Sequence, residues 1–480
     1  MRTSRHATFP HVRRIATASA AAVAGLALTM GTVTTPAQAQ DLVPQSDKEA
    51  KKVVEDRQAE DSSSLNRSNV PEGVSVEQAK KAIEKSDEIT TADVEYAAAL
   101  QDLPDSGVPE DFYTTPATLP DENGGVVKQV ASKFYLDPAK LIEHSAKSET
   151  FMYKTTDEEG AARAATATLL TPEGAKEDAE DAVVIAPGTQ GIADKCAPSR
   201  QMGMGTEYEG ISVTSALAAK RPVVVVDYVG LGTEGAHSYL NRVEEGRSVL
   251  DAARAAQEVK GSSINADTKL QLRGYSQGGQ ATAAALELKK DWAPELNVVS
   301  ASAGAVPTDL YETVSGLSSV YTAFALYGVD SFARQADVDM TKHLNQKGLD
   351  AVDRASNQCT IEALVSNAFL DTDTLTKDGT SFQKLIEDNF LEVADKQKIG
   401  QAEIPDIPLL VNHSHLDDVV PFALGKELAS TWCDAGHKVL FRDNLGLTHL
   451  GGYIAAVPRI EIFTNRTLAG KAPVDSCWRL

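Results

Sequence analysis

From residue 183 onward, short apolar runs recur along the chain and are separated by longer stretches of helix-forming residues. The runs lie at residues 183–185, 223–226, 298–301, 409–411 and 439–441, and Leu270 and Leu272 mark a further one. Short continuous apolar runs are consistent with strands that are buried on both faces. Because these runs alternate with helices, we predict an α/β fold with a mostly parallel sheet covered on both faces.

A β-hairpin is expected upstream of these runs. Residues 149–154 and 162–170 flank the polar sequence Asp-Glu-Glu-Gly at 157–160, a pattern that is typical of an antiparallel pair. Ligands of open α/β sheets bind beyond the carboxyl ends of the strands. Functional residues are therefore expected in the loops that follow the parallel strands.

One such loop carries the sequence Gly274-Tyr-Ser-Gln-Gly278. A Gly-x-Ser-x-Gly pattern arises by chance about 0.1 times in a chain of this length, so the pattern alone is weak. Here a strand precedes it and residues 280–290, rich in helix formers, follow it. This context predicts a nucleophile elbow, in which only glycine fits at positions 274 and 278 and Ser276 is the nucleophile.

The partners of such a serine follow in the order acid, then histidine. His449 lies in a glycine-flanked loop after the last apolar run, whereas His437 precedes that run and would lie at the wrong end of the sheet. We therefore predict that His449 is the base, because its imidazole must reach both the serine hydroxyl and a carboxylate.

Three aspartates are candidates for the acid: Asp417 and Asp418, which follow the run at 409–411, and Asp443, which stands near the histidine loop. We favour Asp417, since the acid must be a buried carboxylate that orients the imidazole. The nearby His413 and His415 are expected to be structural or exposed.

An oxyanion hole needs two backbone N–H groups. One should come from Gln277, the residue after the nucleophile, and the other from the loop at 186–198, whose glycines allow close approach to the site. The residues alone leave the donor within that loop open.

The N-terminal 39 residues have the features of a secretory signal peptide: four arginines within the first 14 residues, an apolar run at 15–30, and Ala37 and Ala39 at an A-x-A cleavage site. The paired arginines leave twin-arginine export as an alternative to ordinary secretion. Residues 40–109 are charged and polar and are expected to form a flexible or loosely helical extension.

The net charge of -22 argues against nucleic acid or an anionic membrane as a partner. In an exported chain, the four cysteines indicate disulfides rather than metal ligands or reactive thiols. No CxxC or HExxH pattern occurs, so we expect no metal site. The C-terminus has no apolar tail that would anchor it to a membrane.

From residue 111 to the C-terminus, the chain resembles the secretory lipase family, the lipase A-like branch of α/β-hydrolases found in fungi and among secreted actinobacterial triacylglycerol lipases. The resemblance rests on separated motifs in the family's order, at residues 187–191, 194–199, 227–233, 245–247, 274–279, 417–421 and 448–449. The segment before residue 111 departs from the family pattern.

The resemblance implies a triad of Ser276, Asp417 and His449. It implies oxyanion donors at Gln277 and Asp194, and disulfides that pair Cys196 with Cys359 and Cys433 with Cys477. It also implies that residues 305–404, too long for an ordinary connection, form a mainly helical cap or lid. The aromatic residues of this insertion either line an acyl pocket or form the cap's own core, and composition leaves both readings open.

We therefore expect a secreted serine hydrolase, with residues 110–480 as the catalytic domain. It should cleave carboxylic esters, with triacylglycerols as the favoured substrates, and need no cofactor. Its partner would be a lipid or ester substrate, encountered at an oil–water interface or in solution. The alternatives are a short-chain carboxylesterase, a cell-envelope acyltransferase and, last, a noncatalytic binding scaffold. The sequence leaves the oligomeric state open.

Overall fold

The structure is a computed structural model that describes residues 62, 65–85, 89–100, 105–317, 319–471 and 474–480. The predicted signal peptide, residues 1–39, lies outside the described residues, as does the start of the predicted extension.

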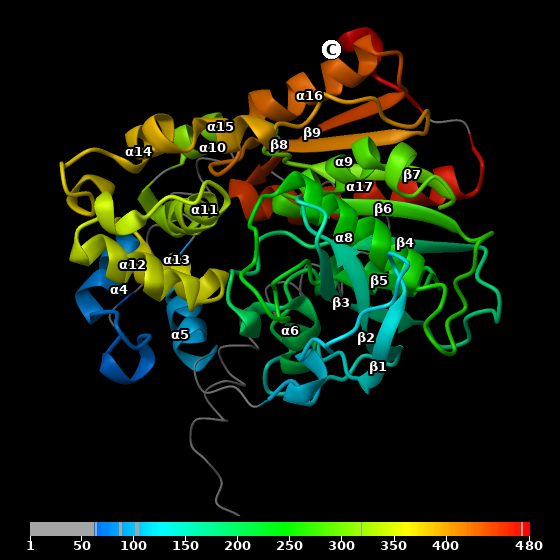
Figure 1. Cartoon of the computed structure of the whole chain (residues 1–480), viewed down its shortest axis with the longest axis horizontal. Coiled ribbons are helices and arrows are strands. Elements are labelled where there is room, and N and C mark those ends of the chain that lie inside the picture. Colours follow the sequence, from blue (N-terminus) through cyan, green and yellow to red (C-terminus); the bar gives the residue numbers. More distant parts are fainter. Residues whose placement is uncertain (1–61, 63–64, 86–88, 101–104, 318, 472–473) are drawn as a thin grey trace, which may run out of the picture.

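Within the described part of the chain, nine strands form one sheet in the order β1-β2-β3-β5-β4-β6-β7-β8-β9 (Figure 1). β1 to β3 and the β3–β5 pair are antiparallel, and the remaining pairs are parallel. The mostly parallel sheet and the upstream hairpin, β2–β3, are as predicted. The strands are β1 (Val126–Ser132), β2 (Lys147–Thr156), β3 (Ala162–Thr171), β4 (Asp181–Ala186), β5 (Val223–Val226), β6 (Lys269–Tyr275), β7 (Val298–Gly304), β8 (Leu409–Leu416) and β9 (Val439–Leu447).

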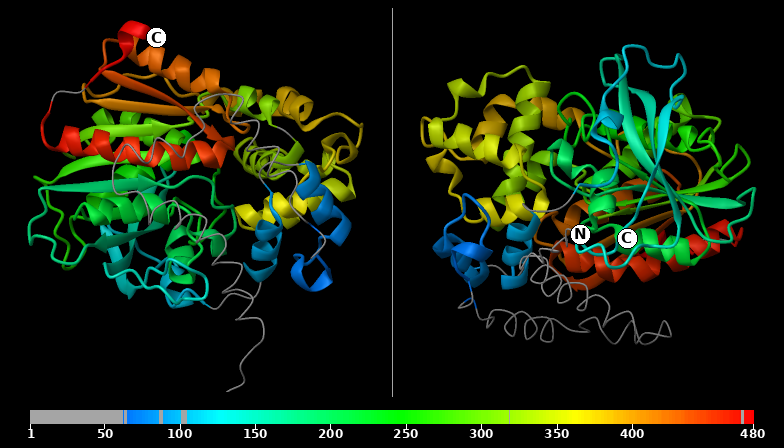
Figure 2. Two further views of the ribbon diagram at one scale, coloured as in Figure 1. Left: turned by 180° about the vertical axis from the view of Figure 1, so that it is seen from behind. Right: turned by 90° about the horizontal axis from the view of Figure 1, so that it is seen from below.

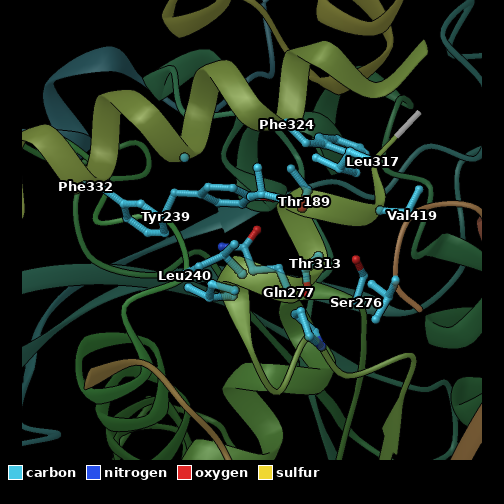
Figure 3. A pocket seen from close by; sticks show the side chains of 15 residues that line it. Thr189, Tyr239, Leu240, Ser276, Gln277, Thr313, Leu317, Phe324, Phe332 and Val419 are labelled. Carbon is cyan, nitrogen blue, oxygen red and sulfur yellow. Dashed lines mark hydrogen bonds between the residues drawn. The ribbon is translucent and has the colours of Figure 1, made fainter. Parts of the chain in front are cut away.

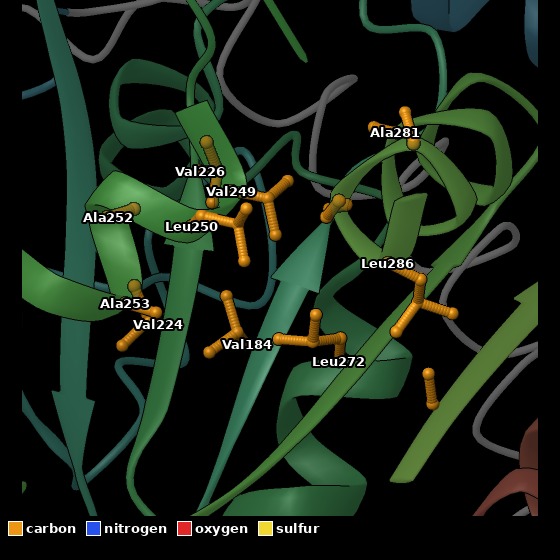
Figure 4. Packing of buried hydrophobic residues seen from close by; sticks show 14 of the residues in the cluster. Val184, Val224, Val226, Val249, Leu250, Ala252, Ala253, Leu272, Ala281 and Leu286 are labelled. Carbon is orange, nitrogen blue, oxygen red and sulfur yellow. The ribbon is translucent and has the colours of Figure 1, made fainter. Parts of the chain in front are cut away.

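Both faces of the sheet are buried under helices. In β5, Val224 and Val226 face the cluster that contains α8 and α9 (Figure 4). Val223 and Val225 face the cluster that contains α7. This alternation follows from the two-residue period of a strand, and it explains the continuous valine run. The helices of the core are α6 (Pro198–Met204), α7 (Gly210–Ala218), α8 (Arg242–Ala255), α9 (Gln277–Trp292), α16 (Phe422–Asp434) and α17 (Thr448–Leu468).

The connection between β7 and β8, where the insertion is predicted, forms a helical cap with its own apolar core. Leu326, Tyr327 and Phe390 are each fully buried within it. Figure 2 shows the cap helices, in yellow, at one side of the molecule and the sheet at the other. The cap helices are α10 (Leu310–Gly316), α11 (Thr322–Gln335), α12 (Gln346–Ser356), α13 (Thr360–Asn367), α14 (Phe382–Asn389) and α15 (Leu391–Lys396).

Two N-terminal helices, α4 (Val76–Lys85) and α5 (Thr91–Leu100), pack against the cap. Ala82 of α4 and Val94 of α5 are fully buried, in one cluster with Val365 of α13. Of the two alternatives predicted for residues 40–109, flexible or loosely helical, the described part is therefore helical, and it packs on the cap. The segment is charged on its outer side, but its few apolar side chains share one face and bury it on the cap.

Two disulfides tie separate parts of the chain together. Cys196 bonds Cys359 across 163 residues, which joins the loop after β4 to the start of α13 in the cap. Cys433 bonds Cys477 across 44 residues, which joins the end of α16 to the C-terminal segment. Both pairs are those that the family resemblance implies.

Candidate active site

Ser276 lies at the turn between β6 and α9, in a backbone conformation that non-glycine residues rarely adopt. Its φ is 59° and its ψ is -125°, and its N–H donates to the carbonyl of Gly304 at 3.0 Å. Such strain persists only where the surrounding structure imposes it, most often at functional sites. The turn has the form predicted for a nucleophile elbow.

The two glycines around Ser276 have no space for a side chain. A Cβ at Gly274 would lie 2.1 Å from the carbonyl oxygen of Gly278, and a Cβ at Gly278 would lie 1.9 Å from that of Ala186. The packing therefore confirms that only glycine fits at these positions, and it brings the loop after β4 against the elbow.

His449 and Asp417 are hydrogen-bonded to each other beside this turn. The Nδ1 atom of His449 lies 2.8 Å from Oδ2 and 2.9 Å from Oδ1 of Asp417. The imidazole also packs on the ring of Tyr275, the residue before Ser276, with ring centroids 5.0 Å apart. Because the carboxylate engages Nδ1, a proton exchanged by this imidazole passes through Nε2.

His449 lies in the first turn of α17 rather than in a loop. The chain reverses at Thr448, whose φ is 64°, and the glycines after His449 are helical. Gly452 is required there, because a Cβ at this position would lie 2.7 Å from the hydroxyl oxygen of Tyr275. The glycine-rich sequence therefore reflects close helix packing rather than loop flexibility.

Asp417 is the most constrained of the three candidate acids. Its Oδ1 accepts hydrogen bonds from the N–H groups of Val419 and Val420 at 3.0 and 2.8 Å, and its side chain is fully buried. Burial alone would raise its pKa, but His449 and His413 outweigh this effect and hold the pKa of Asp417 well below its usual range. The carboxylate is therefore ionised at neutral pH.

The other candidates bind elsewhere. Asp418 accepts from the hydroxyl of Tyr321 at 2.9 Å and from the backbone N–H of His449 at 3.0 Å, so it supports the turn rather than the imidazole. Asp443 is bonded to Nε2 of His415, at 2.8 Å.

His413 is fully buried, as expected for a structural residue. Its Nε2 lies 3.0 Å from the carbonyl of Val420 and 3.4 Å from Oδ2 of Asp417. Gly425 makes room for this ring, because a Cβ there would lie 2.2 Å from Nδ1 of His413.

A narrow pocket of about 30 Å³ opens beside Ser276 under α11 (Figure 3). The core contributes Ser276, Gln277 and a wall from separate loops, and the cap contributes an apolar roof. The lining residues are Thr189, Tyr239, Leu240, Ser276, Gln277, Pro307, Leu310, Thr313, Val314, Leu317, Phe324, Gly328, Phe332, Val419 and Val420. The cap therefore narrows the space above Ser276, which remains half-buried.

The cap aromatics divide between the two readings that composition left open. Phe324 and Phe332 line the pocket (Figure 3), whereas Tyr327 is fully buried in the cap's own core and Tyr321 packs under the N-terminal helices. Sequence reasoning missed Tyr239, Leu240 and Thr189 as lining residues. Of these three residues, only Thr189 lies in a motif that the sequence analysis identified, Pro-Gly-Thr-Gln-Gly at 187–191.

The two predicted oxyanion donors lie in different surroundings. Gln277 is the first residue of α9 and lines the pocket with Ser276. Asp194 is exposed, does not line the pocket, and its carboxylate accepts the N–H of Gly232 at 3.2 Å. From the same loop after β4, Thr189 lines the pocket beside Ser276.

The side chain of Gln277 is held from behind the pocket. Its Nε2 lies 2.7 Å from Oε1 of Glu245 and 2.9 Å from Nε2 of His237. Sequence reasoning noted Glu245 only within a family motif and did not identify His237.

Across the described ranges, no cluster of three or more His, Cys, Asp or Glu side chains could hold a metal ion. No helix in the same residues is long and apolar enough to cross a membrane.

The family model described as secretory lipase matches residues 196–476, which is more than half of the chain. Among curated relatives, the secreted triacylglycerol lipase LIP7 of Malassezia globosa is 25% identical over 390 residues, covering 77% of this chain and 81% of the relative. Lipase A of Moesziomyces aphidis is 27% identical over 396 residues, covering 76% and 81%.

Solved structures show the same fold. Candida antarctica lipase A in its closed state superposes with a TM-score of 0.67 at 23% identity, covering 78% of this chain and 91% of that one. The rice cell wall degrading esterase LipA from Xanthomonas oryzae superposes with a TM-score of 0.59 at 18% identity, covering 73% and 100%. The predicted α/β-hydrolase fold with a cap is confirmed.

Proposed function

Since the chain belongs to the secretory lipase family, we propose that it is a secreted serine hydrolase that releases fatty acids from triacylglycerols through an acyl-enzyme. We assign catalysis to residues 110–480 and export to the first 39 residues. The curated relatives named as secreted triacylglycerol lipases support the substrate class.

The observation that carries this proposal is the strained Ser276 at the end of an apolar pocket, beside an imidazole that a buried carboxylate holds at Nδ1. In acylation, Oγ of Ser276 attacks the ester carbonyl while Nε2 of His449 takes the hydroxyl proton. The same proton then passes to the departing diacylglycerol oxygen. In deacylation, water attacks the acyl-enzyme, His449 takes one proton from it, and the fatty acid leaves as Oγ regains a proton.

The oxyanion of each tetrahedral intermediate would be stabilised by the N–H of Gln277 at the start of α9. The helix N-terminus adds a favourable dipole at this point. For the second donor we propose the backbone around Thr189, because this residue lines the pocket and Asp194 does not. Asp194, which the family resemblance implies as the second donor, would then instead hold the loop in place by accepting the N–H of Gly232.

The narrowness of the pocket favours a substrate that moves the cap. Binding sites for drug-sized ligands occupy at least about 300 Å³, and the space beside Ser276 is about 30 Å³. A long acyl chain therefore requires α10 and α11 to shift from the core, a change that contact with an oil–water interface would favour by binding the apolar residues this exposes.

The test measures hydrolysis of emulsified triacylglycerols and of soluble esters from short to long acyl chains by purified protein. Ser276→Ala should lower kcat by at least about 10⁴-fold and leave the thermal unfolding midpoint unchanged within a few degrees, because the residue is small and half-buried. A fluorophosphonate should label the wild type and not this variant.

Release of long-chain fatty acid that depends on Ser276 would support the lipase assignment. Activity confined to short soluble esters would replace it with a carboxylesterase, and transfer to an added alcohol in preference to water would replace it with an acyltransferase. Hydrolysis retained by Ser276→Ala would refute the triad.

A further inference from the structure

The side chain of Gln277 points away from the chemistry that its backbone is proposed to perform. It is buried, with 2% of its surface exposed, and its amide nitrogen is bound by both Glu245 and His237. Neither of these residues lines the pocket. They form a buried polar layer directly behind the first turn of α9.

His237 is held in one tautomer by its surroundings. Its Nδ1 lies 3.0 Å from the carbonyl of Val229, so Nδ1 carries the hydrogen and donates it. Nε2 is then an acceptor and receives the amide hydrogen of Gln277. The ring also stacks on Tyr228 at 5.8 Å with planes 15° apart, which fixes its orientation.

Glu245 joins the same amide to the pocket wall. It lies in the first turn of α8, and its Oε1 accepts from the N–H of Leu240 at 2.8 Å as well as from Gln277 at 2.7 Å. Leu240 lines the pocket next to Gln277 (Figure 3). One carboxyl group therefore sets the spacing between the wall of the pocket and the start of α9.

We infer that Glu245 and His237 are positioning residues for the reaction, which hold Gln277 so that its backbone N–H is aimed at the developing oxyanion. This inference rests on the proposed function. Oxyanion donors act only within a narrow range of distances, and a displacement of about 1 Å can lower a rate about 10²-fold. The two hydrogen bonds of the buried Gln277 side-chain amide limit the displacement of Gln277.

Burial disfavours the charged forms of both residues in this layer. Burial raises the pKa of Glu245 to about 8, while its bonds to Gln277 and Leu240 lower it, and Glu244 raises it further. Burial lowers the pKa of His237 to about 4, and Arg334 lowers it further. The other titratable groups that face Glu245 are the phenols of Tyr228 and Tyr239, whose pKa values lie higher still.

Ionisation of Glu245 has a direct consequence for the reaction. It places a buried negative charge next to the residue that must stabilise an oxyanion. We therefore expect kcat to fall as the pH rises through about 8, in addition to any effect of the triad.

The experiment compares Glu245→Ala, Glu245→Gln and the control Glu244→Gln, which changes the neighbouring buried carboxyl on the same helix. Rates are expressed per site labelled by a fluorophosphonate, so that misfolded protein does not contribute. Glu245→Ala should lower kcat about 10- to 100-fold with KM changed less than about threefold, and Glu244→Gln should match the wild type.

Glu245→Gln keeps an acceptor oxygen and cannot ionise. It should restore most of the kcat lost in Glu245→Ala, and its kcat should not decline above pH 8. Gln277→Ala should reproduce the defect of Glu245→Ala, and the double variant should be no worse than either single variant, because all three remove the same constraint.

The inference is overturned if the wild type hydrolyses esters and the kcat of Glu245→Ala stays within about twofold of the wild-type value. The proposed function would then remain intact. Additive losses in the double variant, or an alkaline decline that persists in Glu245→Gln, would also overturn the inference. If Glu245→Ala does not fold, the kcat of Gln277→Ala and the pH dependence of kcat in Glu245→Gln still test the inference. A wild type without ester hydrolysis would remove the proposed function itself.

Discussion

The core and the cap build the same pocket by different means. In the core, Ser276, Asp417 and Gln277 are each fixed by directional bonds or by backbone that has no space to relax. In the cap, Phe324 and Phe332 present apolar surface and make no hydrogen bond through their side chains. Bonds fix the position of reacting atoms, whereas apolar contact fixes only shape and area. The core should therefore set the rate of the reaction and the cap the choice of acyl chain.

The largest test of this division is Asp417→Asn in the core. An amide keeps the shape of the side chain but presents N–H groups to Nδ1 of His449 or to the backbone N–H groups of Val419 and Val420, and it stabilises no imidazolium. We expect kcat to fall about 10⁴-fold for short and long esters alike. The rate is measured on protein whose fraction of sites labelled by a fluorophosphonate is known.

Asp443→Asn is the matched control, because this aspartate is bonded to His415 rather than to the candidate base. It should keep kcat within about twofold. A comparable loss in Asp443→Asn, together with an active Asp417→Asn, would exchange the roles of the two residues.

The next test separates the cap from the core by removing their covalent link. The double variant Cys196→Ala, Cys359→Ser opens a loop of 163 residues. Chain entropy predicts that this lowers the free energy of unfolding by up to about 5 kcal/mol. Cys359 precedes α13 and its cap segment also binds the pocket loop, since Thr360 donates to the carbonyl of Thr189 at 2.6 Å. We therefore expect a lower unfolding midpoint and a higher KM for long esters.

The control is the pair Cys433→Ala and Cys477→Ser. It opens a loop of 44 residues, for which the same entropy relation gives up to about 4 kcal/mol, but it lies at the end of α16 and contacts no residue of the pocket. Its unfolding midpoint should fall by a similar amount with KM unchanged. Equal changes in KM for both pairs would show that the cap link has no special relation to the pocket.

Much of the core was predictable from the sequence because its constraints are local. The elbow needs glycine at 274 and 278, and the structure shows why in two clashes of about 2 Å with backbone oxygens. The order of the strands along the chain then placed Asp417 and His449 at the same edge of the sheet. Each of these inferences required only the immediate neighbours of a residue.

The features that the sequence did not predict depend on contacts between distant segments. The resemblance implies Asp194 as an oxyanion donor, which stays a prediction, and only the fold shows that Thr189 of the same loop lines the pocket. The hydrogen bonds of Gln277 join residues 32 and 40 positions apart, and a histidine such as His237 carries no local signal of them. The charged and polar composition of residues 40–109 predicts a flexible or loosely helical segment. It gives no signal of the cap surface, far along the chain, on which α4 and α5 pack.

The smallest effect, and the most selective, should come from the cap. Gly328 lines the pocket from within α11, and a Cβ at this position would meet no atom within 4 Å. Alanine should stabilise the helix by up to about 1 kcal/mol with little effect on hydrolysis, whereas Gly328→Leu should project into the pocket.

We expect Gly328→Leu to lower kcat/KM for long-chain esters about tenfold, equivalent to the loss of one or two buried methylenes, and to leave short-chain esters within about twofold. The ratio of the two activities is the measurement, so any general loss of folded protein cancels. Equal losses for short and long esters would mean that residue 328 acts through the packing of the cap rather than through the length of the pocket, and the division of roles between core and cap would then fail at this position.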